Sequence, residues 1–360
     1  MACEITKKWL VLPLLLLAAN CMQSYRVHGE PKVPCLFIFG DSLSDSGNNN
    51  NLPTAAKANY KPYGIDFITG PTGRFTNGRN AIDFITQFLG FEDLIPPFAN
   101  TSDSDILKGV NYASGSAGIR VESGMQLGAR ISLEFQLVNH RIIVSRIAAK
   151  LGGLDKALQY LNKCLYYVNI GGNDYINNYF LPQFYPTSLI YTVEQYTQTL
   201  INSLSLQLQA LHDVGARKHV LVGIGFIGCT PRAISTNGVN GSCVPEQNAA
   251  ALIFNGKLKS LVDQFNSKYS ADSKFIFINS TAGTLDPSLG FTVTSASCCP
   301  TRADGQCAPN QTPCQNRNQY VFYDQFHPTE AVNLFTAIGS YNASNPAFTY
   351  PVDIKHLVRS

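Results

Sequence analysis

Charged side chains are scarce in this sequence. Only 14% of its 360 residues are Asp, Glu, Lys or Arg, well below the roughly 25% typical of soluble domains. No basic stripe stands out along the chain, which argues against nucleic acid as a partner. No apolar run after residue 29 approaches the roughly 20 residues that a bilayer span needs, so no transmembrane segment is expected in the mature chain.

The first 29 residues are typical of a secretory signal peptide. Lys7 and Lys8 precede an apolar run over 9–19 that is too short for a membrane anchor. Without the three basic residues and one acidic residue of this segment, 24 of the 27 basic and 23 of the 24 acidic residues remain. We expect the mature chain, 30–360, to be a secreted, extracellular, near-neutral monomer.

Eight of the ten cysteines lie in the mature chain, and export favours disulfides. Cys35 and Cys164 begin apolar strand-like runs, where we expect buried free thiols. No C-x-x-C pair or spaced histidines accompany the cysteines, so we expect neither a metal nor another cofactor. We predict two or three disulfides among the cysteines of two irregular loops, namely Cys229, Cys243, Cys298, Cys299, Cys307 and Cys314.

Sequons for N-glycosylation also suit an exported protein. The chain has five candidates: Asn100, Asn240, Asn279, Asn310 and Asn342. A sequon marks only an acceptor, so which of the five carry glycans is left open.

Strand-like and helix-like segments alternate along the mature chain. Short apolar runs predict buried strands at 35–40, 109–113, 164–171, 219–225 and 274–279. Longer stretches predict helices at 80–90, 132–152, 192–212 and 245–268, with a last helix just after His327-Pro328. Apolar strands that alternate with helices indicate a parallel sheet covered on both faces. No repeat or linker divides the chain, so we predict one α/β domain.

Polar residues gather where the predicted strands end. Ser42 follows the first strand in Gly40-Asp41-Ser42, Gly115 follows the second, and Asn173 follows the third. Each is an ordinary turn residue when taken alone. Ligands of an open parallel sheet bind outside the carboxyl ends of its strands, so these residues are expected at one edge. Asp324 and His327 near the end of the chain complete a set suited to acyl transfer.

The chemistry assigns each member of this set a role. The hydroxyl of Ser42 is a poor nucleophile until a base removes its proton, and His327 can act as that base and later as an acid. Asp324 lies three residues before His327 and can hold its imidazole in one tautomer. The N–H groups of Ser42 and Gly115 and the amide of Asn173 are candidate donors to an oxyanion.

The choice of histidine has one competitor. Asp353-x-x-His356 has the same spacing as Asp324-x-x-His327. His356 lies four residues from the C-terminus, however, where fraying is common, whereas His327 follows a cysteine-rich loop that can hold it in place. We therefore predict His327 as the base.

Four segments that hold these residues resemble the conserved blocks of the plant GDSL esterase/lipase family of SGNH hydrolases: "FIFGDSLSDSGNNN", "NYASGSAGI", "IGGNDY" and "DQFHPTE". The resemblance extends over about residues 34 to 340. It implies a three-layer α/β/α fold with a five-stranded parallel sheet in flavodoxin-like order 2-1-3-4-5. It also implies metal-independent hydrolysis of ester or lipid substrates by Ser42, Asp324 and His327, with Gly115 and Asn173 in the oxyanion hole. Phe226, Pro300 and Tyr323 depart from the family's common residues, and the last two are expected to alter the rim of the pocket.

Other functions remain open at this point. An ordinary α/β-hydrolase is disfavoured because G-x-S-x-G occurs nowhere in the chain. A glycosidase that uses two of Asp41, Asp45 and Asp174 ranks low because nothing sets the distance between them. An acyltransferase with the same acyl-enzyme, or a catalytically silent binding or defence protein on the same fold, is not separated by the sequence from an ester hydrolase.

Overall fold

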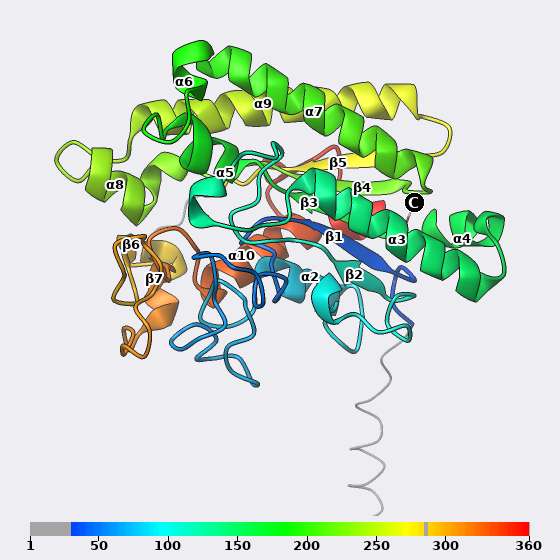
Figure 1. Ribbon diagram of the computed structural model, residues 1–360, viewed down its shortest axis with the longest axis horizontal. Coiled ribbons are helices and arrows are strands. Elements are labelled where there is room, and N and C mark those ends of the chain that lie inside the picture. The colour runs from blue at the N-terminus through cyan, green and yellow to red at the C-terminus, as the bar shows by residue number, and fades with distance from the viewer. Residues whose placement is uncertain (1–29, 284–286, 360) are drawn as a thin grey trace, which may run out of the picture.

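A computed structural model describes residues 30–283 and 287–359, so the predicted signal peptide lies outside the described residues. Figure 1 shows a central twisted sheet between two layers of helices. Its order is β2-β1-β3-β4-β5-β8, and the first five strands pair in parallel. These strands are β1 (Leu36–Gly40), β2 (Gly109–Asn111), β3 (Leu165–Asn169), β4 (Lys218–Val222) and β5 (Lys274–Ile278). The predicted α/β class and strand order are confirmed.

The sheet has one strand more than expected. The two-residue strand β8 (Thr349–Tyr350) pairs antiparallel with β5 at the edge of the sheet. A second, two-stranded sheet joins β6 (Val293–Ser297) to β7 (Tyr320–Phe322), in the loop region that precedes His327. Elements this short carry little periodic signal in the sequence.

Helices cover both faces of the sheet (Figure 1). On one face, Phe37 and Phe39 of β1 share a core with helices α3 (Leu133–Leu151), α7 (Val193–Asp213) and α9 (Pro245–Lys268). On the other face, Leu36 and Ile38 pack with α2 (Ala81–Phe88), α10 (Glu330–Tyr341) and α11 (Ile354–Leu357). Successive side chains of a strand point to opposite faces, so a strand covered on both faces is apolar throughout. Shorter helices are α4 (Leu154–Leu161), α5 (Gly172–Asp174), α6 (Thr187–Ile190) and α8 (Pro231–Asn237).

Four disulfides join all eight cysteines of the described chain. Three lie within the two loops, as predicted, and pair Cys229 with Cys243, Cys298 with Cys314 and Cys299 with Cys307. The expectation of free thiols at Cys35 and Cys164 is wrong, because these two residues form the fourth bridge, with their Cα atoms 4.7 Å apart. Each stands one residue before a strand, and β1 and β3 are neighbours in register, which brings the two sulfurs together.

In the described part of the chain, no helix is long and apolar enough to cross a membrane. Four of the five sequon asparagines are exposed: Asn100, Asn240, Asn310 and Asn342. The Asn279 side chain is only partly exposed, and its Oδ1 accepts hydrogen bonds from the N–H and the hydroxyl of Thr281. Glycosylation itself remains a prediction.

Candidate active site

Ser42 stands on a tight turn at the carboxyl end of β1. Asp41 forms this turn by accepting the N–H of Leu43 at 3.0 Å. Gly40 is required where the strand ends, because a Cβ there would lie 2.7 Å from the carbonyl oxygen of Asn169. The side chain of Gln136 on α3 bonds both the N–H and the carbonyl of Gly40, which fixes the end of the strand.

Three predicted residues meet at this turn. The Nε2 atom of His327 lies 2.8 Å from the Oγ of Ser42, across 285 residues of sequence. Its Nδ1 lies 2.7 and 2.9 Å from the two carboxylate oxygens of Asp324. A carboxylate can only accept, so Nδ1 carries the proton and Nε2 is free to accept the proton of Ser42.

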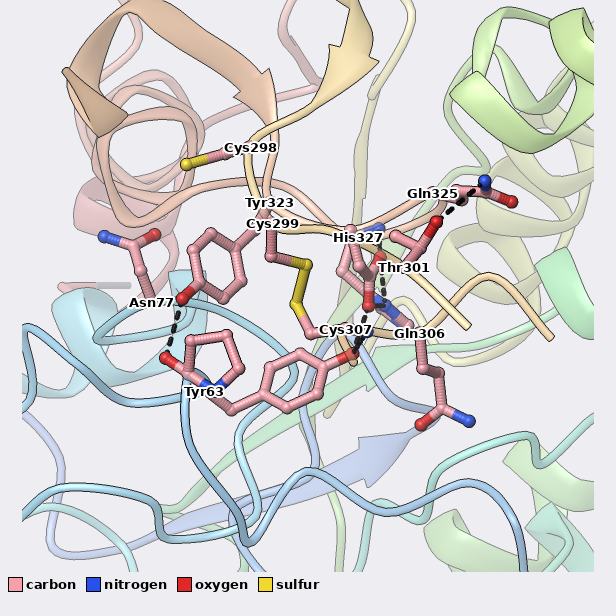
Figure 2. Close-up of a disulfide and its surroundings, with 12 residues drawn as sticks. Tyr63, Asn77, Cys298, Cys299, Thr301, Gln306, Cys307, Tyr323, Gln325 and His327 are labelled. Atoms are coloured by element: carbon pink, nitrogen blue, oxygen red, sulfur yellow. Dashed lines mark hydrogen bonds and ion pairs between the residues drawn. A yellow bond between two sulfur atoms is a disulfide. The ribbon is translucent and has the colours of Figure 1, made fainter. Parts of the chain in front are cut away.

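The carboxylate of Asp324 is itself held by several donors. Its Oδ1 accepts the N–H groups of Phe326 and His327, each at 2.8 Å. Its Oδ2 accepts the hydroxyl of Tyr63 at 2.5 Å. Figure 2 shows Tyr63 beside His327 and the Cys299–Cys307 disulfide, and the N–H of Cys307 donates to the Tyr63 hydroxyl at 3.1 Å.

Sequence reasoning missed Tyr63 because it lies in the long irregular stretch 41–79, where neither spacing nor periodicity marks it. Tyr323, which was expected to alter the rim of the pocket, is instead buried against Tyr63, with ring centroids 5.9 Å apart. Its hydroxyl donates to the carbonyl of Pro62 at 2.6 Å. Tyr323 therefore packs against Tyr63 and helps to hold it in place.

Asn173 lies in the short helix α5 just after β3, and a chain of hydrogen bonds holds its amide. Its Nδ2 donates to the carbonyl of Ala117 at 3.0 Å, and its Oδ1 accepts from the Nδ2 of Asn177 at 2.6 Å. The Nε2 of Gln126 donates to the Oδ1 of Asn177 at 2.7 Å, and the hydroxyl of Tyr185 donates to the Oε1 of Gln126.

The carbonyl of Ala117 sets the direction of donation along this chain of hydrogen bonds. The carbonyl of Ala117 can only accept, so the NH₂ end of Asn173 must face it. Each following amide then has only one orientation that pairs a donor with an acceptor. Asn177 sits in the π-helical turn Tyr175–Tyr179, at φ −120° and ψ 25°, and such turns often mark functional sites.

Gly115, the predicted oxyanion donor just after β2, already has a hydrogen-bond acceptor for its N–H. The N–H of Gly115 donates to the Oδ2 of Asp45 at 2.9 Å, so in this structure it does not point to an open oxyanion site. No acceptor appears for the N–H of Ser42 or Ser116 among the described residues, and both residues line the same cavity as Asn173. Ser116 adopts φ 63°, a left-handed conformation uncommon for residues with a side chain.

The asparagines after Ser42 are more than turn residues. Asn48 donates to the carbonyls of Asn111 and Ala113, and Asn49 donates to those of Ala56 and Gly115. Both asparagines are buried. They satisfy backbone groups that would otherwise be unpaired inside the protein, and so join the turn of β1 to the exit of β2.

Three buried carboxyl groups surround the site. Burial raises the pKa of Asp41 to about 7, and the pKa values of Asp45 and Asp174 to about 6. Asp174 accepts the N–H groups of Ile119 and Arg120, and Asp45 accepts three backbone N–H groups. These contacts hold loops in place, which does not favour a glycosidase that uses these carboxylates.

No other histidine within 30–283 and 287–359 contacts Ser42. His356 pairs with Asp353 at 2.6 Å on α11, on the face of the sheet opposite to α3, α7 and α9, and its side chain is 62% exposed. His140 and His219 are fully buried, and burial lowers the pKa of each to about 3, so both remain neutral.

A cavity of about 840 Å³ opens above Ser42, His327 and Asn173, within the roughly 300–1,000 Å³ of small-molecule sites. No group of three or more His, Cys, Asp or Glu side chains that could hold a metal ion occurs within 30–283 and 287–359. The arrangement therefore presents a hydroxyl, a base with its orienting carboxylate, and an amide donor to one cavity.

Comparison with known proteins identifies the family of the chain. A model of the GDSL-like lipase/acylhydrolase family matches residues 36–338. The chain is 48% identical to the GDSL esterase/lipase At1g29670 of Arabidopsis thaliana, over 99% of each chain, and 47% identical to At1g29660 of the same plant, over 98% of each. Among solved structures it resembles an extracellular lipase of Streptomyces rimosus, with 14% identity, a TM-score of 0.34, and coverage of 87% of this chain and 97% of that one. The chain belongs to the GDSL-like lipase/acylhydrolase family of carboxylic ester hydrolases.

Proposed function

We propose that the protein is a secreted serine esterase or lipase that hydrolyses carboxylic esters of lipid or acylated-carbohydrate type. The observation that carries this proposal is the continuous pairing of Ser42 Oγ with His327 Nε2 and of His327 Nδ1 with Asp324. Ser42 and His327 lie 285 residues apart in sequence, and Ser42 is partly exposed at a cavity. Their contact is therefore not needed to hold the fold together.

In the first half of the reaction, His327 Nε2 takes the proton of Ser42 while Oγ bonds to the ester carbonyl carbon. The carbonyl π electrons move to the oxygen, and the oxyanion lies against the amide of Asn173 and the N–H of Ser42. His327 then gives its proton to the alcohol oxygen as the carbon–oxygen bond breaks. The alcohol leaves, and Ser42 carries the acyl group.

In the second half, water replaces the alcohol. His327 takes a proton from the water, the hydroxyl oxygen bonds to the acyl carbon, and the proton returns to Ser42 as the acid leaves. Asp324 stays ionised throughout and stabilises the imidazolium. For the third oxyanion donor we propose the N–H of Ser116 in place of that of Gly115, because Asp45 occupies the latter.

The test compares the purified wild-type protein with Ser42→Ala on p-nitrophenyl butyrate, with and without glycerol as an acceptor. Hydrolysis that is lost in the variant supports the proposal. Acyl product that appears mainly on glycerol favours an acyltransferase, and equal background activity in both proteins would show a catalytically silent protein. Secretion is tested separately by finding the N-terminus of the protein in the culture medium, which we expect near residue 30.

A further inference from the structure

The Cys299–Cys307 disulfide lies beside the residues that orient His327 (Figure 2). Its two Cα atoms are 5.5 Å apart, and both cysteines are buried in one apolar cluster with Tyr63, Phe75 and Tyr323. Of the four bridges in the described chain, only this one contains a residue that hydrogen-bonds the hydroxyl of Tyr63.

The hydrogen bonds of the Tyr63 hydroxyl can run in only one direction. The ionised carboxylate of Asp324 only accepts, so the Tyr63 O–H donates to its Oδ2 at 2.5 Å. A peptide N–H only donates, so the N–H of Cys307 donates to the Tyr63 oxygen at 3.1 Å. Successive bonds that run in the same direction polarise one another, so the N–H of Cys307 strengthens the bond from Tyr63 to Asp324.

The bridge determines where this N–H lies. It ties Cys307 to Cys299, whose own N–H donates to the carbonyl of Tyr323 at 2.9 Å. The N–H of Tyr323 donates in turn to the carbonyl of His327 at 2.8 Å. The disulfide therefore joins the backbone group that holds the Tyr63 hydroxyl to the backbone that holds His327.

We propose that the Cys299–Cys307 disulfide positions the Tyr63 hydroxyl against Asp324 and in this way raises the rate of the reaction. This inference rests on the proposed serine esterase function. Without the bridge, the N–H of Cys307 is free to move away from Tyr63. The Tyr63 hydroxyl then loses the donor that fixes its oxygen, and its bond to Asp324 weakens.

The loop that the bridge closes also has hydrogen bonds of its own. The N–H of Arg302 donates to the carbonyl of Gln306 at 2.8 Å, and the N–H of Ala308 donates to that of Pro300 at 2.7 Å. We therefore expect the loop to keep its overall path when the bridge is removed. The effect on catalysis is then a loss of alignment, and it cannot exceed the effect of removing the Tyr63 hydroxyl itself.

The neighbouring Cys298–Cys314 bridge provides the matched control. Its sequence separation is 16 against 8, so its loss should lower the urea midpoint at least as far. We expect kcat for p-nitrophenyl butyrate to fall roughly three- to tenfold in Cys299→Ala/Cys307→Ala, with KM within twofold. In Cys298→Ala/Cys314→Ala, kcat should stay within twofold of wild type. Equal kcat values in the two variants would overturn the proposal, because lost stability alone would affect both.

A double-mutant cycle tests whether the bridge acts through Tyr63. Once Tyr63→Phe has removed the hydroxyl, the further change Cys299→Ala/Cys307→Ala should lower kcat less than twofold. Independent effects would instead multiply. Two losses that multiply would overturn the proposal and would show that the bridge serves only the stability of the loop.

A second measurement needs no substitution. Folded wild type is treated with dithiothreitol, which is oxidised to its cyclic disulfide as each bridge gains two hydrogens, until alkylation and peptide mapping find Cys299 and Cys307 reduced. Activity should fall with the labelled fraction of these two cysteines and not with that of Cys229 and Cys243. Full activity with Cys299 and Cys307 labelled would overturn the proposal. Loss of hydrolysis in Ser42→Ala tests the proposed function alone, whatever the effect of the bridge.

Discussion

The hydroxyl of Tyr63 lies 2.5 Å from Oδ2 of Asp324, although 261 residues separate the two in sequence. Both groups are buried, and burial together with the neighbouring Asp324 carboxylate raises the pKa of Tyr63 well above its usual value. The tyrosine therefore stays protonated and donates to Asp324. It is a positioning residue, because it acts on the carboxylate that orients His327 and does not contact Ser42.

Tyr63→Phe should lower kcat about tenfold with little change in KM, since a hydrogen bond to a charged group is worth roughly 1.5–3 kcal/mol. Tyr60→Phe is the matched control, because its hydroxyl bonds the carbonyl of Cys307 in the same cluster without touching Asp324. Steady-state kinetics on p-nitrophenyl butyrate measures both variants. Equal kcat values in the two would show that the bond to Asp324 has no part in catalysis.

Asn177 should matter through the orientation of Asn173. Asn177→Asp removes the donor to Oδ1 of Asn173 and offers only acceptors, so the amide of Asn173 is expected to turn and present its oxygen to the oxyanion. We predict a loss in kcat of about 100-fold, within the range for a lost oxyanion donor, and a smaller loss in Asn177→Ala. Gln183→Ala, an exposed change in the same cavity wall, serves as the control. A change confined to KM would contradict this role.

The Cys35–Cys164 bridge closes a loop with a sequence separation of 129. Replacing both cysteines by alanine should lower the free energy of unfolding by about 3–5 kcal/mol, as for a long closed loop. The bridge lies at the amino ends of β1 and β3, whereas Ser42 lies at the carboxyl end of β1, so kcat should stay within twofold. Urea denaturation measures the first quantity. Thiol labelling of the unfolded, unreduced wild type should find no free thiol in the mature chain. Labelled thiols at Cys35 and Cys164 would instead show that these two cysteines are not bridged.

The stability of the protein should depend on pH through Asp41. Burial raises its pKa in the folded state to about 7, above the usual value of about 3.9 for an aspartate. Between these values the folded state holds a proton that the unfolded state has released, so stability falls as pH rises from about 4 to 7. Between pH 5 and pH 8, Asp41→Asn should remove on the order of 3 kcal/mol of this decrease. Urea midpoints at pH 5 and pH 8 test this, with the exposed Asp213→Asn as control; an unchanged pH dependence in Asp41→Asn would contradict it.

Much of the fold was predictable because its strands are buried on both faces. Continuous apolar runs marked all five parallel strands, and the residues after them marked the edge where Ser42, Asn173 and His327 meet. The disulfide between Cys35 and Cys164 was harder to predict, although the sequence held a clue to it. The order 2-1-3 places the first and third strands side by side, and each cysteine stands one residue before its strand.

What escaped prediction depends on side-chain contacts between loops. Nothing in the spacing shows that Asp45 accepts the N–H of Gly115, or that Tyr63 reaches Asp324. Both contacts arise because the long stretch 41–79 folds back over the carboxyl ends of the strands. Local propensity says little about such a path, which tertiary hydrogen bonds determine.

The central claim is that Ser42 becomes acylated with His327 as its base. Labelling with a fluorophosphonate, which modifies only activated serines, followed by peptide mapping tests it most directly. The proposed function predicts one adduct, on Ser42, that is lost in Ser42→Ala, falls at least about 100-fold in rate in His327→Ala, and is retained in His356→Ala. An adduct on another residue, or equal labelling rates in His327→Ala and His356→Ala, would contradict it.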